Sequence, residues 1–149
     1  MRPSDHCLRI ALVPSPATDE QVVSDLASGL VRRGHRVRLY SAEEGYERLF
    51  RRLRADGADV VSHHAADAHA IELAARLPVL HTLRVPPNTD AVVRALRGSN
   101  APLAAVSQYI AAQWRDAVGR DMQVIRDGVP DFAPVTGLVQ PVALIAGRI

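Results

Sequence analysis

Residues 58–87 read ADVVSHHAADAHAIELAARLPVLHTLRVPP, and this stretch decides the fold. A short β-branched run leads into two adjacent histidines, His63 and His64, an alanine-rich segment follows them, and a second apolar run occupies residues 79–83. This order predicts a strand, a polar turn that holds both histidines, a helix and a second strand. Because ligands of open α/β sheets bind beyond the carboxyl ends of the strands, the histidine turn is the first place to expect a site.

The same alternation continues on both sides of this stretch. Apolar runs at residues 8–13, 35–41, 103–106 and 122–125 predict further strands, and helical patterns lie between them. Residues suited to helix capping begin four of the helices: Thr18 with Gln21, Ser41 with Glu44, Thr89, and Ser107. The chain is therefore predicted to be an α/β protein with a Rossmann-like, open, mostly parallel sheet and helices on both faces.

Composition excludes several classes of protein. All 18 basic residues are arginine, yet the net charge is only +2 and the arginines are interspersed with acids, so a nucleic-acid partner is not expected. No apolar run is long enough to cross a bilayer, and the first residues lack the apolar segment of a signal peptide. We therefore expect a cytoplasmic protein without a transmembrane segment. The single cysteine, Cys7, is predicted to be a buried or half-buried thiol.

Six segments occur in an order that is typical of one family. They are LVRRGHRVRLYSA (30–42), ADVVSHH (58–64), LPVLHTLRVPP (77–87), AAVSQYIAAQW (104–114), VIRDGV (124–129) and VALIAGRI (142–149). Together they resemble the N-terminal half of family 4 retaining glycosyltransferases, which have the GT-B fold. The resemblance spans almost the whole chain and rests on the order and spacing of the segments, since no single motif is decisive.

The resemblance implies a division of the chain and a set of partners. Residues 1–133 are expected to form the acceptor-binding domain, and residues 134–149 the linker and first strand of a C-terminal donor-binding domain. The implied partners are a small-molecule or glycan acceptor and a nucleotide-sugar donor bound with that C-terminal half, with no metal cofactor. The chain by itself is expected to be inactive. The apolar strand at residues 142–146 is also a candidate for self-association.

The resemblance also implies the site residues. His64 matches the last histidine of a D-V-h-H-x-H motif and is the expected catalytic residue, with a role in acceptor orientation or proton handling. Ser15, Arg84 and Ser107 are the expected substrate-binding residues. Ser15 lies in a proline-rich opening loop where the family often carries a glycine pair, and Arg84 replaces a histidine of the family motif. Asp127 stands where the family has asparagine, which keeps the turn chemistry and adds a charge.

Other interpretations of the same residues remain. His63, His64, Asp67 and His69 spell HHxxDxH, but this spacing matches no zinc pattern, so a metal site is not expected. His63 points to the opposite side if the strand persists and is then structural, and His81 is predicted to be an interior histidine with a hydrogen-bond partner. The alternative function is a non-catalytic α/β binding or regulatory module. A nicotinamide-binding domain is disfavoured because no glycine-rich fingerprint follows the first strand.

Overall fold

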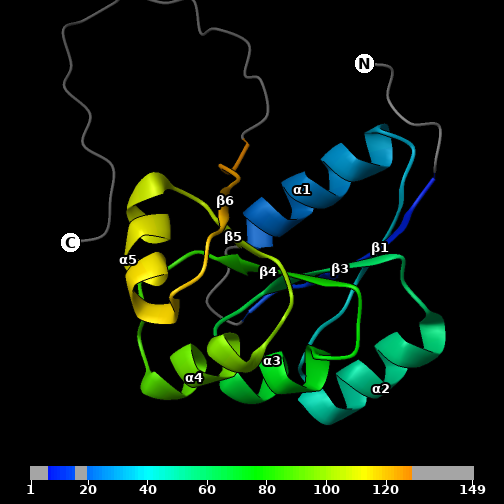
Figure 1. Ribbon diagram of the computed structural model, residues 1–149. Coiled ribbons are helices and arrows are strands. Elements are labelled where there is room, and N and C mark those ends of the chain that lie inside the picture. Colours follow the sequence, from blue (N-terminus) through cyan, green and yellow to red (C-terminus); the bar gives the residue numbers. More distant parts are fainter. Residues whose placement is uncertain (1–6, 16–19, 129–149) are drawn as a thin grey trace, which may run out of the picture.

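The computed structural model describes residues 7–15 and 20–128, and within these ranges the chain forms an α/β fold (Figure 1). The strands are β1 (Arg9–Val13), β2 (Arg36–Leu39), β3 (Val60–His64), β4 (Val79–Leu83), β5 (Leu103–Ala105) and β6 (Gln123–Val124). The helices are α1 (Glu20–Arg32), α2 (Tyr46–Asp56), α3 (Ala68–Ala74), α4 (Asp90–Gly98) and α5 (Gln108–Val118). The predicted Rossmann-like sheet is confirmed, and all of its described strand pairs are parallel.

The strand order places a switch point next to the histidines. The order across the sheet is β2-β1-β3-β4-β5-β6, so the chain moves outward from β1 in one direction and from β3 in the other. Ligands of such sheets bind at the carboxyl ends of the two strands where the direction reverses. In this fold those strands are β1 and β3, and β3 ends at His64.

The two faces of the sheet are covered unequally. Alternate side chains of the central strands pack against α2, α3, α4 and α5 in two apolar clusters, whose central members include Phe50, Leu53, Leu83, Leu96 and Trp114. On the other face α1 is the one described helix that covers the sheet, through Val23 packed on Ile10 and Leu12 (Figure 1). No helix among the described residues covers that face over β3 and β4, where it borders a hollow.

Local signals set most helix ends. The hydroxyl of Thr89 accepts a hydrogen bond from the amide of Val92 at 3.3 Å, and the hydroxyl of Ser107 accepts one from Ile110 at 3.2 Å. Both are the predicted caps. The helix α5 ends as predicted at Gly119, whose φ of 68° is in the left-handed region. The Thr18 cap falls among residues 16–19, outside the described residues.

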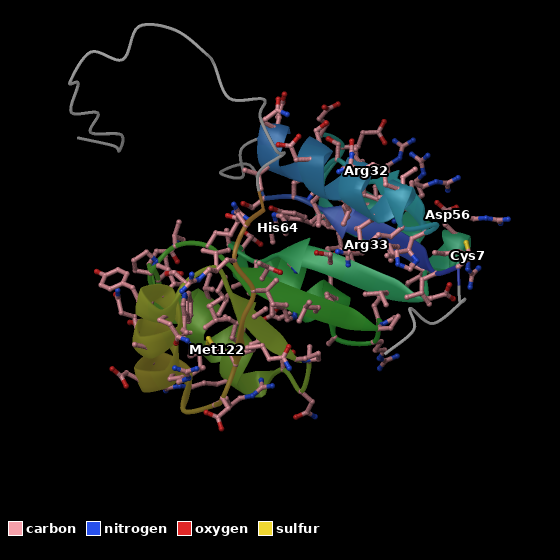
Figure 2. All side chains as sticks on the ribbon, turned by 90° about the horizontal axis from the view of Figure 1, so that it is seen from above. Cys7, Arg32, Arg33, Asp56, His64 and Met122 are labelled. Carbon is pink, nitrogen blue, oxygen red and sulfur yellow. The ribbon has the colours of Figure 1, made fainter. Side chains whose placement is uncertain are left out.

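Two local predictions are wrong. The second helix begins at Tyr46 after Gly45, whose φ is 87°, whereas the sequence predicted a start capped by Ser41. The hydroxyl of Ser41 instead accepts from the Glu43 amide at 3.2 Å, because the chain makes a turn there before the helix begins. Cys7 is exposed and not buried, because it precedes the first strand, which starts at Arg9. Figure 2 shows Cys7 and His64 at opposite ends of the sheet.

Candidate functional site

His63 and His64 belong to β3 itself. The sequence predicted that the strand stops at Ser62, but the parallel pairing continues, with His63 opposite His81 and His64 opposite Thr82. That prediction is wrong because parallel pairing with β4 extends β3 through both histidines. Successive side chains of a strand point to opposite faces, so the two histidines enter different environments. The expectation that His63 points away from His64 is thereby met.

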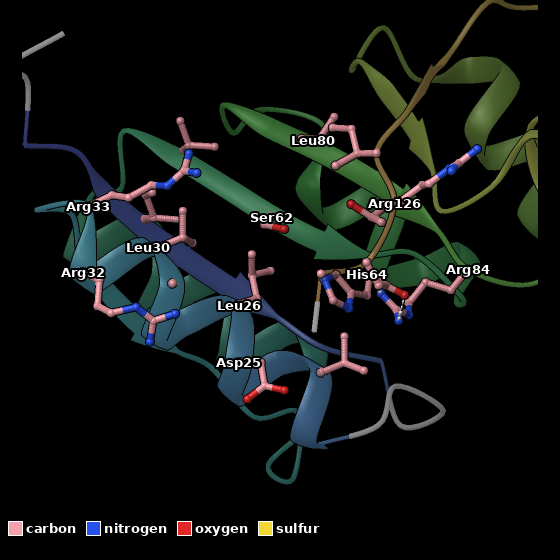
Figure 3. Close-up of a pocket in the computed structure, with 18 residues that line it drawn as sticks. Asp25, Leu26, Leu30, Arg32, Arg33, Ser62, His64, Leu80, Arg84 and Arg126 are labelled. Carbon is pink, nitrogen blue, oxygen red and sulfur yellow. Dashed lines mark hydrogen bonds and ion pairs between the residues drawn. The ribbon is translucent and has the colours of Figure 1, made fainter. Parts of the chain in front are cut away.

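His64 points into a hollow between α1 and the uncovered face of the sheet (Figure 3). The hollow has a volume of about 510 Å³. It is lined by Ile10, Val22, Asp25, Leu26, Gly29, Leu30, Arg32, Arg33, Val60, Ser62, His64, Leu80, Thr82, Arg84, Ile125, Arg126, Asp127 and Gly128. We call this hollow the α1 groove. Its volume lies within the range of small-molecule sites, which is about 300–1,000 Å³.

The imidazole of His64 is buried but incompletely satisfied. Its side chain is only 3% exposed, and Nδ1 has no hydrogen-bond partner among the described residues. Burial and, to a smaller extent, the nearby Arg84 lower the pKa of His64 to about 4, while Asp127 acts in the opposite direction. The ring is therefore neutral at pH 7. A neutral imidazole with an unpaired nitrogen can form a hydrogen bond with a ligand hydroxyl.

Arg84 is already paired. Its guanidinium donates two hydrogen bonds to the carboxylate of Asp127, at 2.8 Å and 2.5 Å (Figure 3). The Arg84 side chain is 19% exposed and that of Asp127 is 38% exposed, so the pair is partly shielded from water. This two-point geometry is the strongest way in which these groups can pair. Because two of the five N–H donors of Arg84 are engaged, an anionic ligand would compete with Asp127 for this side chain.

Asp127 is one site residue whose role sequence reasoning did not identify. It was interpreted only as a turn residue, although it follows β6 at the same edge where Arg84 follows β4. The sequence did contain a signal for this pair. The carboxyl ends of parallel strands share one edge of the sheet, so an acidic residue that follows one strand can pair with a basic residue that follows another. The pairing itself depends on how far apart β4 and β6 lie, which the sequence does not state.

The structure does not bring all the predicted site residues together. His64 and Arg84 line the α1 groove, whereas Ser15 borders a separate hollow of about 660 Å³ beyond β1 and β2, with Glu20 and Tyr40 in its wall. Ser107 caps α5 and does not line the α1 groove. Ligand contacts by Ser15 and Ser107 stay predictions.

The four residues of the HHxxDxH segment also lie apart. His63 faces the core, whereas His64 faces the α1 groove. The carboxylate of Asp67 accepts a hydrogen bond from the Ala70 amide at 3.0 Å, and Nε2 of His69 lies 3.1 Å from Oε1 of Glu47. Within residues 7–15 and 20–128, no group of three or more histidine, cysteine, aspartate or glutamate side chains is placed to hold a metal ion. The part of the chain that the structure describes also contains no helix able to span a membrane.

Comparison with known proteins assigns no family to the chain. No protein-family model matches it, and no curated protein matches it. Function is therefore argued from the α1 groove, its buried histidine and the order of the six sequence segments.

Proposed function

We propose that the chain is the acceptor-binding domain of a retaining glycosyltransferase that uses a nucleotide-sugar donor. The observation that carries the proposal is the buried imidazole of His64, whose unpaired Nδ1 lies at the carboxyl end of β3 beside the switch point. The resemblance of six ordered segments to family 4 glycosyltransferases supports it. In that family the donor is held mainly by the second domain, so this chain is assigned the acceptor.

In this proposal His64 positions the acceptor hydroxyl. A pKa of about 4 makes the ring a weak base, so complete removal of a proton in the ground state is unfavourable. A hydrogen bond from the hydroxyl to the ring nitrogen instead orients the oxygen toward the anomeric carbon. When the new carbon–oxygen bond forms and the bond to the nucleotide diphosphate breaks, the hydroxyl proton leaves toward the imidazole or the departing phosphate. The ion pair of Arg84 with Asp127 holds the edge of the groove in place.

The competing function is a non-catalytic α/β binding module. One observation favours it: the guanidinium expected to hold an anionic acceptor or a donor phosphate is engaged by Asp127 at 2.5–2.8 Å. A module of this kind binds a ligand in the α1 groove and transfers nothing. Binding and turnover therefore have to be measured separately.

The test compares two histidine variants. Turnover of nucleotide sugars is measured in the protein or complex that supplies the donor-binding domain, and glycoside binding is measured on the chain by calorimetry. His64→Ala is expected to lower turnover by about a hundredfold, the lower range for loss of a group that handles a proton. His69→Ala is the matched control, because its side chain is 56% exposed and contacts Glu47 away from the groove.

Three results decide between the functions. Loss of turnover in His64→Ala with unchanged circular dichroism supports the transferase proposal. Near-normal turnover in that variant removes His64 from the reaction. Glycoside binding without turnover of any nucleotide sugar favours the binding module.

A further inference from the structure

The floor of the α1 groove changes from apolar to polar along both central strands. On β3 the side chains that face the groove are Val60, Ser62 and His64 in chain order, and on β4 they are Leu80, Thr82 and Arg84. The strands are parallel, with Ser62 opposite Leu80 and His64 opposite Thr82, so the two gradients run in the same direction. Each step of two residues covers about 6.6 Å. A ligand in this groove therefore meets apolar side chains at one end and hydrogen-bonding groups at the other.

The walls of the groove extend its apolar part. Leu26 and Leu30 of α1 face the sheet across the groove (Figure 3), and Val22 and Ile125 also line it. Leu26 is 38% exposed and Ile125 is 49% exposed, which makes them two of the large apolar side chains that the described residues leave open to water. A ligand that buries this apolar surface would gain a binding free energy of about 25 cal/mol per Å².

The charged groups closest to His64 in the groove pair with each other. Arg84 and Asp127 neutralise each other through two hydrogen bonds, and the buried ring of His64 is uncharged at pH 7. The hydroxyls of Ser62 and Thr82 also line the groove, as do Asp25 and Arg126, whose charges are opposite. The exposed Arg32 and Arg33 lie toward the amino ends of the strands, away from His64 (Figure 2). Hydroxyls and a neutral imidazole can both donate to and accept from the hydroxyls of an uncharged ligand.

We infer that the α1 groove binds an amphipathic ligand, with an uncharged polyhydroxyl head at His64 and an apolar body along Val60, Leu80 and Leu26. Two independent observations support this: the parallel gradients on β3 and β4, and the buried Nδ1 of His64 that lacks a partner among the described residues. The inference rests on the proposed function only in naming this ligand as the glycosyl acceptor.

Alkyl glucosides test the inference directly. The full chain is titrated calorimetrically with methyl, n-hexyl and n-octyl β-D-glucoside and with n-octyl phosphate, all below the concentrations at which they form micelles. Each methylene that becomes buried contributes about 0.8 kcal/mol, so the octyl glucoside should bind roughly tenfold more tightly than the hexyl glucoside. Octyl phosphate should bind more weakly than octyl glucoside.

Two variants place the binding in the groove. Leu26→Asp puts a charge on the apolar wall, and Val31→Asp is its matched control, because Val31 is 56% exposed on the same helix and does not line the groove. Gly29→Leu fills the groove without a charge, and its nearest obstacle is the Arg32 guanidinium, 3.9 Å from a Cβ at that position. A leucine also favours the helix, so Gly29→Leu guards against loss of binding through unfolding. Both groove variants should weaken octyl glucoside binding at least tenfold, and Val31→Asp should not.

Several outcomes overturn the inference. They are equal affinity for the three glucosides, tighter binding of octyl phosphate, unchanged binding in both groove variants, or no saturable binding at all, as when another part of the chain fills the groove. Failure of the proposed function gives a different pattern, in which glucosides bind with the expected chain-length dependence but no sugar is transferred. Turnover that is independent of alkyl length contradicts only the inference.

Discussion

Nδ1 of His63 lies 3.1 Å from Nδ1 of His81, in the core on the face of the sheet opposite to His64. Burial, with a smaller effect of the neighbouring histidines, lowers the pKa of His63 to about 3. Burial and the nearby Arg120 lower that of His81 to about 4. Both rings are therefore neutral at pH 7, and the Nδ1–H of one ring donates a hydrogen bond to Nδ1 of the other. The Phe50 ring packs against His63 nearly at a right angle, with the ring centres 5.9 Å apart.

The first prediction concerns acid stability. In the unfolded chain these histidines take up protons near pH 6.5, whereas in the folded chain His63, His64 and His81 stay neutral down to about pH 3–4. Protons therefore bind preferentially to the unfolded state between these values. The contribution that the neutral, buried histidines make to the free energy of unfolding is fully present above pH 6.5. It is lost as the pH falls from 6.5 to about 4, by about 1.4 kcal/mol per pH unit for each histidine.

Urea unfolding at pH 7, 6 and 5 measures this loss. The double variant His63→Leu/His81→Leu should show a shallower dependence on pH, because two of the protonation sites are gone. His69→Gln serves as the histidine control, since its side chain is 56% exposed and contacts Glu47 away from this pair. A double variant with the wild-type pH dependence would contradict the assignment of acid sensitivity to this pair.

The second prediction assigns the proton shared by the two rings. Nε2 of His81 is buried and has no hydrogen-bond partner among the described residues. A buried N–H without an acceptor is rarer in proteins than an unpaired acceptor lone pair, so His81 should carry its proton on Nδ1 and donate it to His63. Nitrogen-15 NMR of the ring couplings distinguishes the two neutral tautomers. Detection of the Nε2–H form of His81 would reverse the assignment.

The third prediction concerns the ion pair at the mouth of the α1 groove. Asp127→Asn removes the charge that neutralises Arg84, so the guanidinium becomes available to anions. Binding of inorganic pyrophosphate should rise by about tenfold, because a hydrogen bond to a charged group contributes about 1.5–3 kcal/mol. The measurement is calorimetric titration. The double variant Asp127→Asn/Arg84→Gln is the control, and its affinity for pyrophosphate should return to that of the wild type. Equal affinity in the single and double variants would assign the binding to other arginines.

The fourth prediction separates the two roles suggested for Ser107. Its hydroxyl accepts from the Ile110 amide at 3.2 Å, so Ser107→Ala should lower the free energy of unfolding by about 1 kcal/mol. Ser107→Asp keeps an acceptor at the helix start and should restore most of it. Octyl glucoside affinity, measured well below the unfolding transition, tests the ligand contact. An affinity unchanged in Ser107→Ala means that the hydroxyl serves the helix alone.

Where the fold could be predicted, the signals were local. Thr89, Ser107 and Gly119 fix helix ends through hydrogen bonds and backbone angles within a few residues, so their roles follow from the sequence itself. The start of the second helix was mispredicted because Gly45 redirects the chain at a φ of 87° and overrides a plausible cap at Ser41. The strand end at Ser62 was mispredicted because pairing with His81 and Thr82 extends β3. The division at residue 133 stays a prediction, since residues 129–149 lie outside the described residues.

The sequence by itself determined that strands and helices alternate and that His63 and His64 face opposite ways if their strand continues, because these properties depend on the periodicity of the backbone. Tertiary structure alone decided what each side chain meets. It paired Arg84 with Asp127, 43 residues apart, and His63 with His81, 18 residues apart. It also left the sheet face above β3 and β4 uncovered by any described helix, which makes the α1 groove. Such contacts depend on strand order and helix placement, which no local pattern of residues specifies.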